Sequence, residues 1–66
     1  MTKPLNRPFE VTSEDRAPEF FRNTLDAQIF ASEQSERNPG KFFIYDHSWN
    51  SEVPAYLYRD GRAVRS

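Results

Sequence analysis

Apolar residues recur with helical spacing in the first half of the chain and alternate with polar ones in the second half. Phe21, Leu25 and Ile29 are four positions apart, so on a helix they would form one stripe facing the core. A helix over residues 18–36 places its proline first, where a missing N–H costs nothing, and Asn-Pro-Gly at 38–40 would end it. Three more apolar residues widen the arc beyond what one packing partner needs: Phe20, Ala27 and Ala31.

The opposite side of this predicted helix is charged. Glu19, Asp26 and Glu33 form an acidic stripe, which is usually a solvated face but also suits a basic surface on a partner. Phe30 falls among these charges, where packing within one chain does not explain a ring. We therefore expect Phe30 and the acidic stripe to contact a partner.

From residue 41 the apolar period changes to two, which predicts β-strands. The predicted strands are Lys41–Asp46, Val53–Arg59 and Arg62–Arg65, and Asp60-Gly61 is a strong signal for a two-residue type I′ turn. Phe9–Val11 also alternates and predicts an optional short strand before the helix. The fold class is therefore α+β, with one helix packed on a three-stranded antiparallel meander (βαβββ with the N-terminal strand).

The turn also predicts which side chains share a face. It pairs Arg59 with Arg62, and if residues 48–51 close the first hairpin, Phe43 opposes Tyr56. Proline 54 then falls where a ladder N–H is needed, so the hairpin should fray there and leave Trp49 at the tip of a longer loop. The face toward the helix would be aliphatic: Phe42, Ile44, Val53, Ala55, Leu57 and Val64. The other face would be aromatic: Phe43, Tyr45, Tyr56 and Tyr58, with Ala63 and Arg65.

Composition limits the protein to one small domain. The chain has 66 residues, 36% of them hydrophobic and 15% aromatic, so its core is thin while many rings need a place. Residues 1–8 are predicted to be an extended arm and residues 9–66 the domain. There is no cysteine, no signal-peptide pattern at the start and no apolar run of the ~20 residues that span a membrane, so we expect a cytoplasmic setting.

No chemical motif survives inspection of its geometry. Asp46-His47-Ser48 holds the residue types of a catalytic triad, but neighbours on a strand point to opposite faces and cannot converge. The alternating polar residues that follow resemble a calcium loop, yet Ser51 stands where glycine is needed and Leu57 where a bidentate glutamate is needed. We expect no catalytic residues, no metal and no cofactor.

The sequence favours a non-enzymatic protein-binding module that attaches to a larger protein or complex and inhibits or redirects it. The alternatives are a single-stranded nucleic-acid binder that uses the aromatic face and C-terminal arginines, a homodimer, and a second small core in which Leu5 and Phe9 cover the rings. A net charge of −1 weighs against nucleic acid. In plan only, the chain resembles small phage-encoded or mobile-element accessory proteins. The predicted contacts are Phe30, Tyr45, Trp49, Tyr56, Tyr58, Glu19, Asp26 and Glu33.

Overall fold

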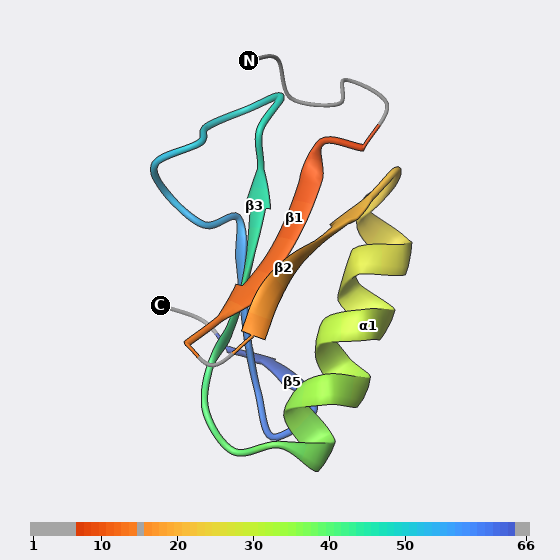
Figure 1. The fold of residues 1–66 in the computed structure, drawn as a ribbon, viewed down its shortest axis with the longest axis vertical. Helices are drawn as coiled ribbons and strands as arrows, with labels where there is room; N and C mark the ends of the chain where they lie inside the picture. Colours follow the sequence, from red (N-terminus) through yellow and green to blue (C-terminus); the bar gives the residue numbers. More distant parts are fainter. Residues whose placement is uncertain (1–6, 15, 65–66) are drawn as a thin grey trace.

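A five-stranded antiparallel sheet with one helix along one face makes up the fold (Figure 1). The computed structural model describes residues 7–14 and 16–64, so most of the predicted arm and Arg65 of the predicted third strand lie outside the described residues. The strand order is β2-β1-β3-β4-β5. The elements are β1 (Phe9–Ser13), β2 (Arg16–Phe21), α1 (Thr24–Arg37), β3 (Phe42–Asp46), β4 (Tyr56–Arg59) and β5 (Arg62–Val64).

The α+β class is confirmed, but the three-stranded meander is only part of the sheet. The N-terminal strand predicted as optional is real, and the first residues of the predicted helix form a further strand, β2, that pairs with β1. Strand β1 also pairs with β3 and so joins this hairpin to the meander. In the part of the chain that is described, no helix is long and apolar enough to cross a membrane.

The helix begins later than predicted, and the reason is its N-cap. Asn23 has an extended backbone, and its side-chain oxygen accepts the Asp26 N–H at 2.8 Å, which satisfies a donor that the first turn leaves free. Pro18 is placed instead in β2, an edge strand, where the missing N–H need not face a neighbour. The end is as predicted: the helix stops at Arg37, and the Asn38 N–H donates to the Gln34 carbonyl at 2.9 Å.

The face that α1 turns to the sheet is made of small residues, contrary to the predicted stripe of large ones. Ala27, Ala31 and Ser35, spaced four apart, are buried, whereas Leu25 is 64% exposed and Ile29 48% exposed. Small side chains let the helix axis approach the sheet closely, so the large residues face away. The buried hydrophobic core is Val11, Ala27, Ala31, Phe42, Ile44 and Tyr58, with Phe9, Phe21 and Phe30 packed at its margin.

The turn between β4 and β5 is as predicted. Asp60 and Gly61 have φ values of 55° and 81°, the positive angles that a type I′ turn needs, and Arg59 lies opposite Arg62. The turn also docks on the helix: the Gly61 N–H donates to Ser35 Oγ, and the Ser32 hydroxyl donates to the Gly61 carbonyl, both at 2.8 Å. This contact fixes the far end of the sheet against α1.

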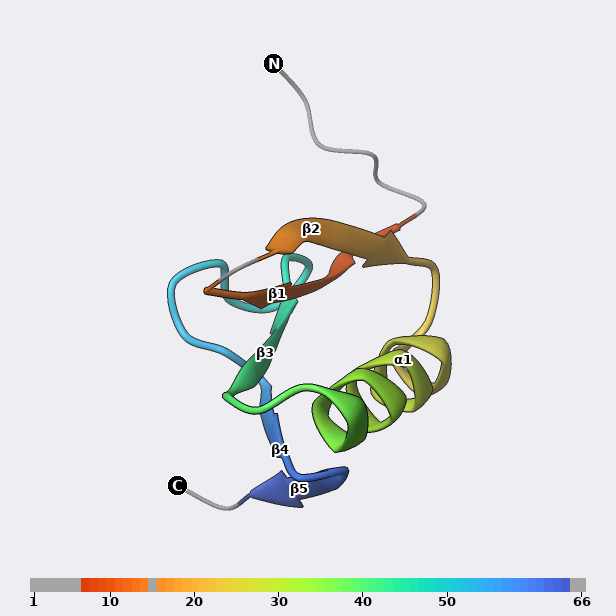
Figure 2. The same cartoon turned by 60° about the horizontal axis from the view of Figure 1, so that its bottom comes forward.

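The predicted register between β3 and β4 is wrong by one residue. Phe43 lies opposite Leu57, not Tyr56, and Ile44 lies opposite Tyr56. A shift of one residue moves every side chain of β4 to the other face, so Tyr58 faces the helix and Leu57 faces away. The connecting segment, residues 47–55, is here called the β3–β4 loop, and its widest part projects on the side of the sheet away from α1 (Figure 2).

Candidate functional site

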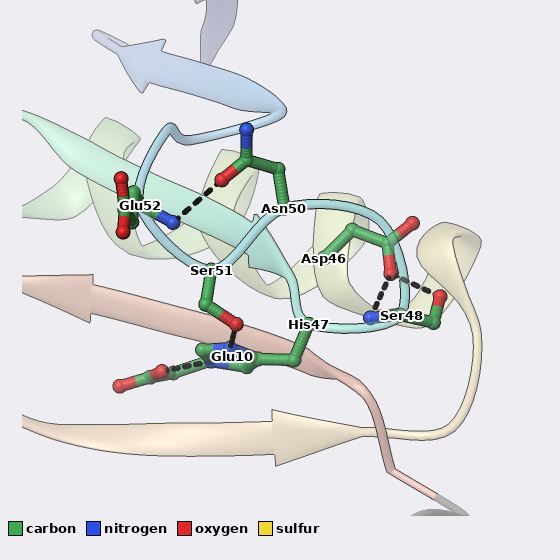
Figure 3. Close-up of polar contacts among 7 residues, drawn as sticks. All are labelled: Glu10, Asp46, His47, Ser48, Asn50, Ser51 and Glu52. Carbon is green, nitrogen blue, oxygen red and sulfur yellow. Dashed lines mark hydrogen bonds and ion pairs between the residues drawn. The ribbon is translucent and has the colours of Figure 1, made fainter.

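Short-range hydrogen bonds fix the backbone of the β3–β4 loop (Figure 3). The Asp46 carboxylate accepts the Ser48 N–H at 3.0 Å and the Ser48 hydroxyl at 2.6 Å. The Asp46 carbonyl accepts the N–H groups of Trp49 and Asn50 at 3.0 and 2.9 Å, and the Asn50 side chain then accepts the Glu52 N–H at 2.8 Å. Of the alternating polar residues that resembled a calcium loop, Asp46 and Asn50 therefore serve as turn-forming acceptors for the backbone.

His47 ties this loop to β1 (Figure 3). Its Nε2 lies 2.5 Å from Glu10 Oε1, and its Nδ1 lies 2.9 Å from Ser51 Oγ. The backbone N–H of His47 donates to the Pro8 carbonyl at 2.9 Å. The ring also stacks on Tyr45, with centroids 6.3 Å apart and planes 15° apart. The histidine therefore bridges two backbone segments that are remote in sequence.

The order of carboxylate, imidazole and hydroxyl in this cluster matches that of a hydrolase triad, with the two ring nitrogens exchanged. Its members are not the consecutive residues considered from the sequence, because Glu10 is 37 positions from His47. The Glu10 contact holds the loop against β1, and the Ser51 contact joins two residues of the loop itself, so we assign the cluster an anchoring role. Among the described residues, no three His, Cys, Asp or Glu side chains gather as a metal-binding group.

Trp49 and Tyr56 flank a shallow hollow between this loop and the start of the helix. Trp49 is 65% exposed, although the hydrogen bonds of its neighbours hold its backbone in place, and Tyr56 is 39% exposed. The hollow has a volume of about 380 Å³ and is here called the loop hollow. It is lined by Phe9, Thr24, Asp46, Trp49, Ala55 and Tyr56.

Two of the predicted aromatic contacts are used inside the protein instead. Tyr58 is buried, and its hydroxyl donates to Gln28 Oε1 on the helix at 2.8 Å. Phe30 is half-buried, with its ring centroid 5.1 Å from that of Phe21 and its side chain against the core. Packing within one chain therefore does explain Phe30. Tyr45 is half-buried on the face away from α1, under the His47 ring.

The predicted acidic stripe is broken. Glu19 is exposed on β2, opposite Val11, and so is not part of the helix. Asp26 and Glu33 stay exposed on α1, where Asp26 accepts a side-chain hydrogen bond from Asn23 at 3.3 Å. Of the residues predicted to contact a partner, the loop hollow brings together only Trp49 and Tyr56.

Comparison with known proteins adds no relative to this description: no family model, curated protein or solved structure matches the chain.

The buried Tyr58 makes the free energy of unfolding vary with pH in the alkaline range. Burial, and to a lesser extent the charge of Tyr56, raises the pKa of Tyr58 above its ordinary value of 10.0. Between these two pKa values the unfolded chain has lost the proton and the folded chain has kept it, so the free energy of unfolding falls as pH rises.

Removing the Tyr58 hydroxyl should separate the effect of its hydrogen bond on stability from the effect of its raised pKa. We expect Tyr58→Phe to cost about 0.5–1.5 kcal/mol near neutral pH, because the hydrogen bond to Gln28 is lost. The same variant should lose less stability than the wild type between about pH 9 and pH 11, because the raised pKa is gone. Urea unfolding followed by circular dichroism across this range measures both, and an equal alkaline loss in the two proteins would contradict the assignment.

Proposed function

We propose that the protein is a non-enzymatic binding module that attaches to a larger protein or complex through the loop hollow and inhibits or redirects it. The observation that carries this proposal is Trp49, a large ring left 65% exposed on a turn whose backbone is already ordered. Leaving such a ring in water forgoes the stabilisation that burial would bring. A partner that covers Trp49 recovers it.

The ordered backbone of the β3–β4 loop supports a role in partner binding. Binding loses affinity when loops and side chains must become ordered, and a turn already held by Asp46, Asn50 and His47 avoids much of that cost. Tryptophan and tyrosine are the residue types that most often dominate binding energy, each as a rigid apolar body with a polar tip. Trp49 and Tyr56 supply one of each beside the same hollow.

The register of the sheet favours a protein partner over single-stranded nucleic acid. The predicted ring platform needs Phe43, Tyr45, Tyr56 and Tyr58 on one face, but Tyr58 is buried against α1 and Tyr56 shares its face. Of this platform only Phe43 and Tyr45, both half-buried, remain on the face away from the helix, and the net charge is −1. Stacking of successive bases along this face therefore has little support.

Affinity capture from the native host, followed by mass spectrometry and titration of the captured partner, tests the proposal. We expect Trp49→Ala and Tyr56→Ala each to weaken binding at least about tenfold, and Trp49→Phe to weaken it less because a ring remains. Arg22→Ala, at an exposed position outside the loop hollow, is the control. Wild-type affinity in both alanine variants, with their folding verified by circular dichroism, would refute the proposal.

A further inference from the structure

Strand β5 is the more accessible edge of the sheet. Within the described chain it pairs only with β4, whereas the opposite edge strand, β2, contains Pro18 and cannot offer a continuous row of N–H groups. A two-residue turn makes Arg59 and Arg62 a hydrogen-bonded pair, and such pairs alternate along the ladder. The N–H and C=O of Ala63 therefore point outward, where an added strand would bond.

An apolar hollow lies beside this edge on the face away from α1. Leu57 and Val64 are directly opposite on β4 and β5, and Phe43 continues the same face on β3. Val64 is 39% exposed, and Val53, which overhangs from the β3–β4 loop, is 50% exposed. The hollow has a volume of about 710 Å³. Its lining is Phe43, Val53, Pro54, Ala55, Tyr56, Leu57, Ala63 and Val64.

Two unpaired arginines lie next to this hollow. Arg59 and Arg62 are opposite each other and, by alternation, on the same face as Leu57 and Val64. Like charges directly across a ladder repel, and both side chains are exposed. Asp60 lies in the turn between them, but within the described residues no carboxylate forms an ion pair with either arginine. A carboxylate from outside would relieve the repulsion through strong charge-assisted hydrogen bonds.

We propose that an extended acidic segment of a partner protein adds to β5 as a sixth strand. Its main chain bonds Ala63, an apolar side chain enters the hollow at Val64, and an aspartate or glutamate two positions away meets Arg59 and Arg62. The spacing of two follows from the alternation of side chains along a strand. This inference rests on the proposed protein-binding function but uses the hollow beside β5, which shares Ala55 and Tyr56 with the loop hollow and does not include Trp49.

Titration of the ¹⁵N-labelled protein with synthetic peptides of about ten residues tests this inference by NMR. The first peptide has threonine at every second position and carries isoleucine and glutamate two positions apart. The second peptide is the same except that lysine replaces the glutamate. A third is the first peptide with N-methyl groups on the amides that would face the edge. We expect the first peptide to shift the amide signals of Leu57, Arg59, Ala63 and Val64, and the other two to bind at least about tenfold more weakly.

Reversing the charge of Arg62 tests the electrostatic part of this inference in the same titration. Arg62→Glu should weaken the glutamate peptide and strengthen the lysine peptide, whereas Arg22→Glu, at an exposed position off the sheet, should change neither. Equal binding of all three peptides, or shifts confined to the loop hollow, would overturn the inference. So would concentration-dependent dimerisation through β5, or tighter binding of a single-stranded oligouridine to the same arginines.

The variant Trp49→Ala keeps this test separate from that of the proposed function. We expect it to bind the glutamate peptide as the wild type does, because Trp49 does not line the hollow beside β5. If Trp49→Ala loses the captured partner while no peptide binds the edge, only the edge inference fails. If the peptide binds and Trp49→Ala keeps its partner, only the proposed role of the loop hollow fails.

Discussion

Replacing Ile44 with alanine should lower the free energy of unfolding by about 2–5 kcal/mol. Ile44 has no exposed surface, lies opposite Val11 on one neighbouring strand and Tyr56 on the other, and belongs to the cluster that includes Ala27 and Ala31. The small helix residues above it cannot move in to fill the space, so the loss includes a cavity as well as buried area. A domain of this size has only about 3–10 kcal/mol in total, at ~0.05–0.15 kcal/mol per residue, so the variant is at the edge of folding.

Ile29→Ala is the matched control, because the chemical change is the same at a position 48% exposed on the helix. We expect its unfolding free energy to stay within about 0.5 kcal/mol of the wild type. Urea unfolding followed by circular dichroism gives both values, and Ile44→Val, at about 0.5–1.5 kcal/mol, keeps the test open if Ile44→Ala does not fold. A loss at Ile29 as large as that at Ile44 would mean that the helix presents its large apolar residues to the sheet after all.

The second large effect is expected from enlarging a small residue, Ala31→Leu. Ala31 has no exposed surface at the contact between helix and sheet, so three more carbons must push α1 away or force strained rotamers. We expect a loss of about 1–3 kcal/mol, although leucine is nearly as good a helix former as alanine. Hydrophobicity alone predicts the opposite change in stability, because a larger apolar residue on an apolar helix face would bury more surface.

Glu33→Leu is the control for this substitution, since it places the same side chain at an exposed position of the same helix. Its effect should stay within about 0.5 kcal/mol. Thermal unfolding reports the difference as a shift of roughly 4–8 °C for each kcal/mol in a domain of this size. An Ala31→Leu variant as stable as the wild type would show that the interface has room, and the close approach of α1 to the sheet would then be wrong.

The candidate site was predictable only in part. The exposed Trp49 at a loop tip followed from Pro54, which cannot continue a paired strand, and the arginine pair followed from Asp60-Gly61. Glu10 was missed as the partner of His47, because nothing local signals a contact between residues 37 positions apart. The same limit applies to Tyr58, whose burial depends on which residue of β3 it opposes.

The sequence by itself determined the elements whose signals are local. These are the end of the helix at Asn38-Pro39-Gly40, strand β3, and the turn at Asp60-Gly61, because proline, glycine and alternation act on the backbone within a few residues. Only the tertiary structure decided that residues 16–21 pair with β1, that Ala27 and Ala31 face the sheet, and that β4 slides by one residue. Each of these depends on how closely two distant segments can pack, and that fit is a property of both surfaces together.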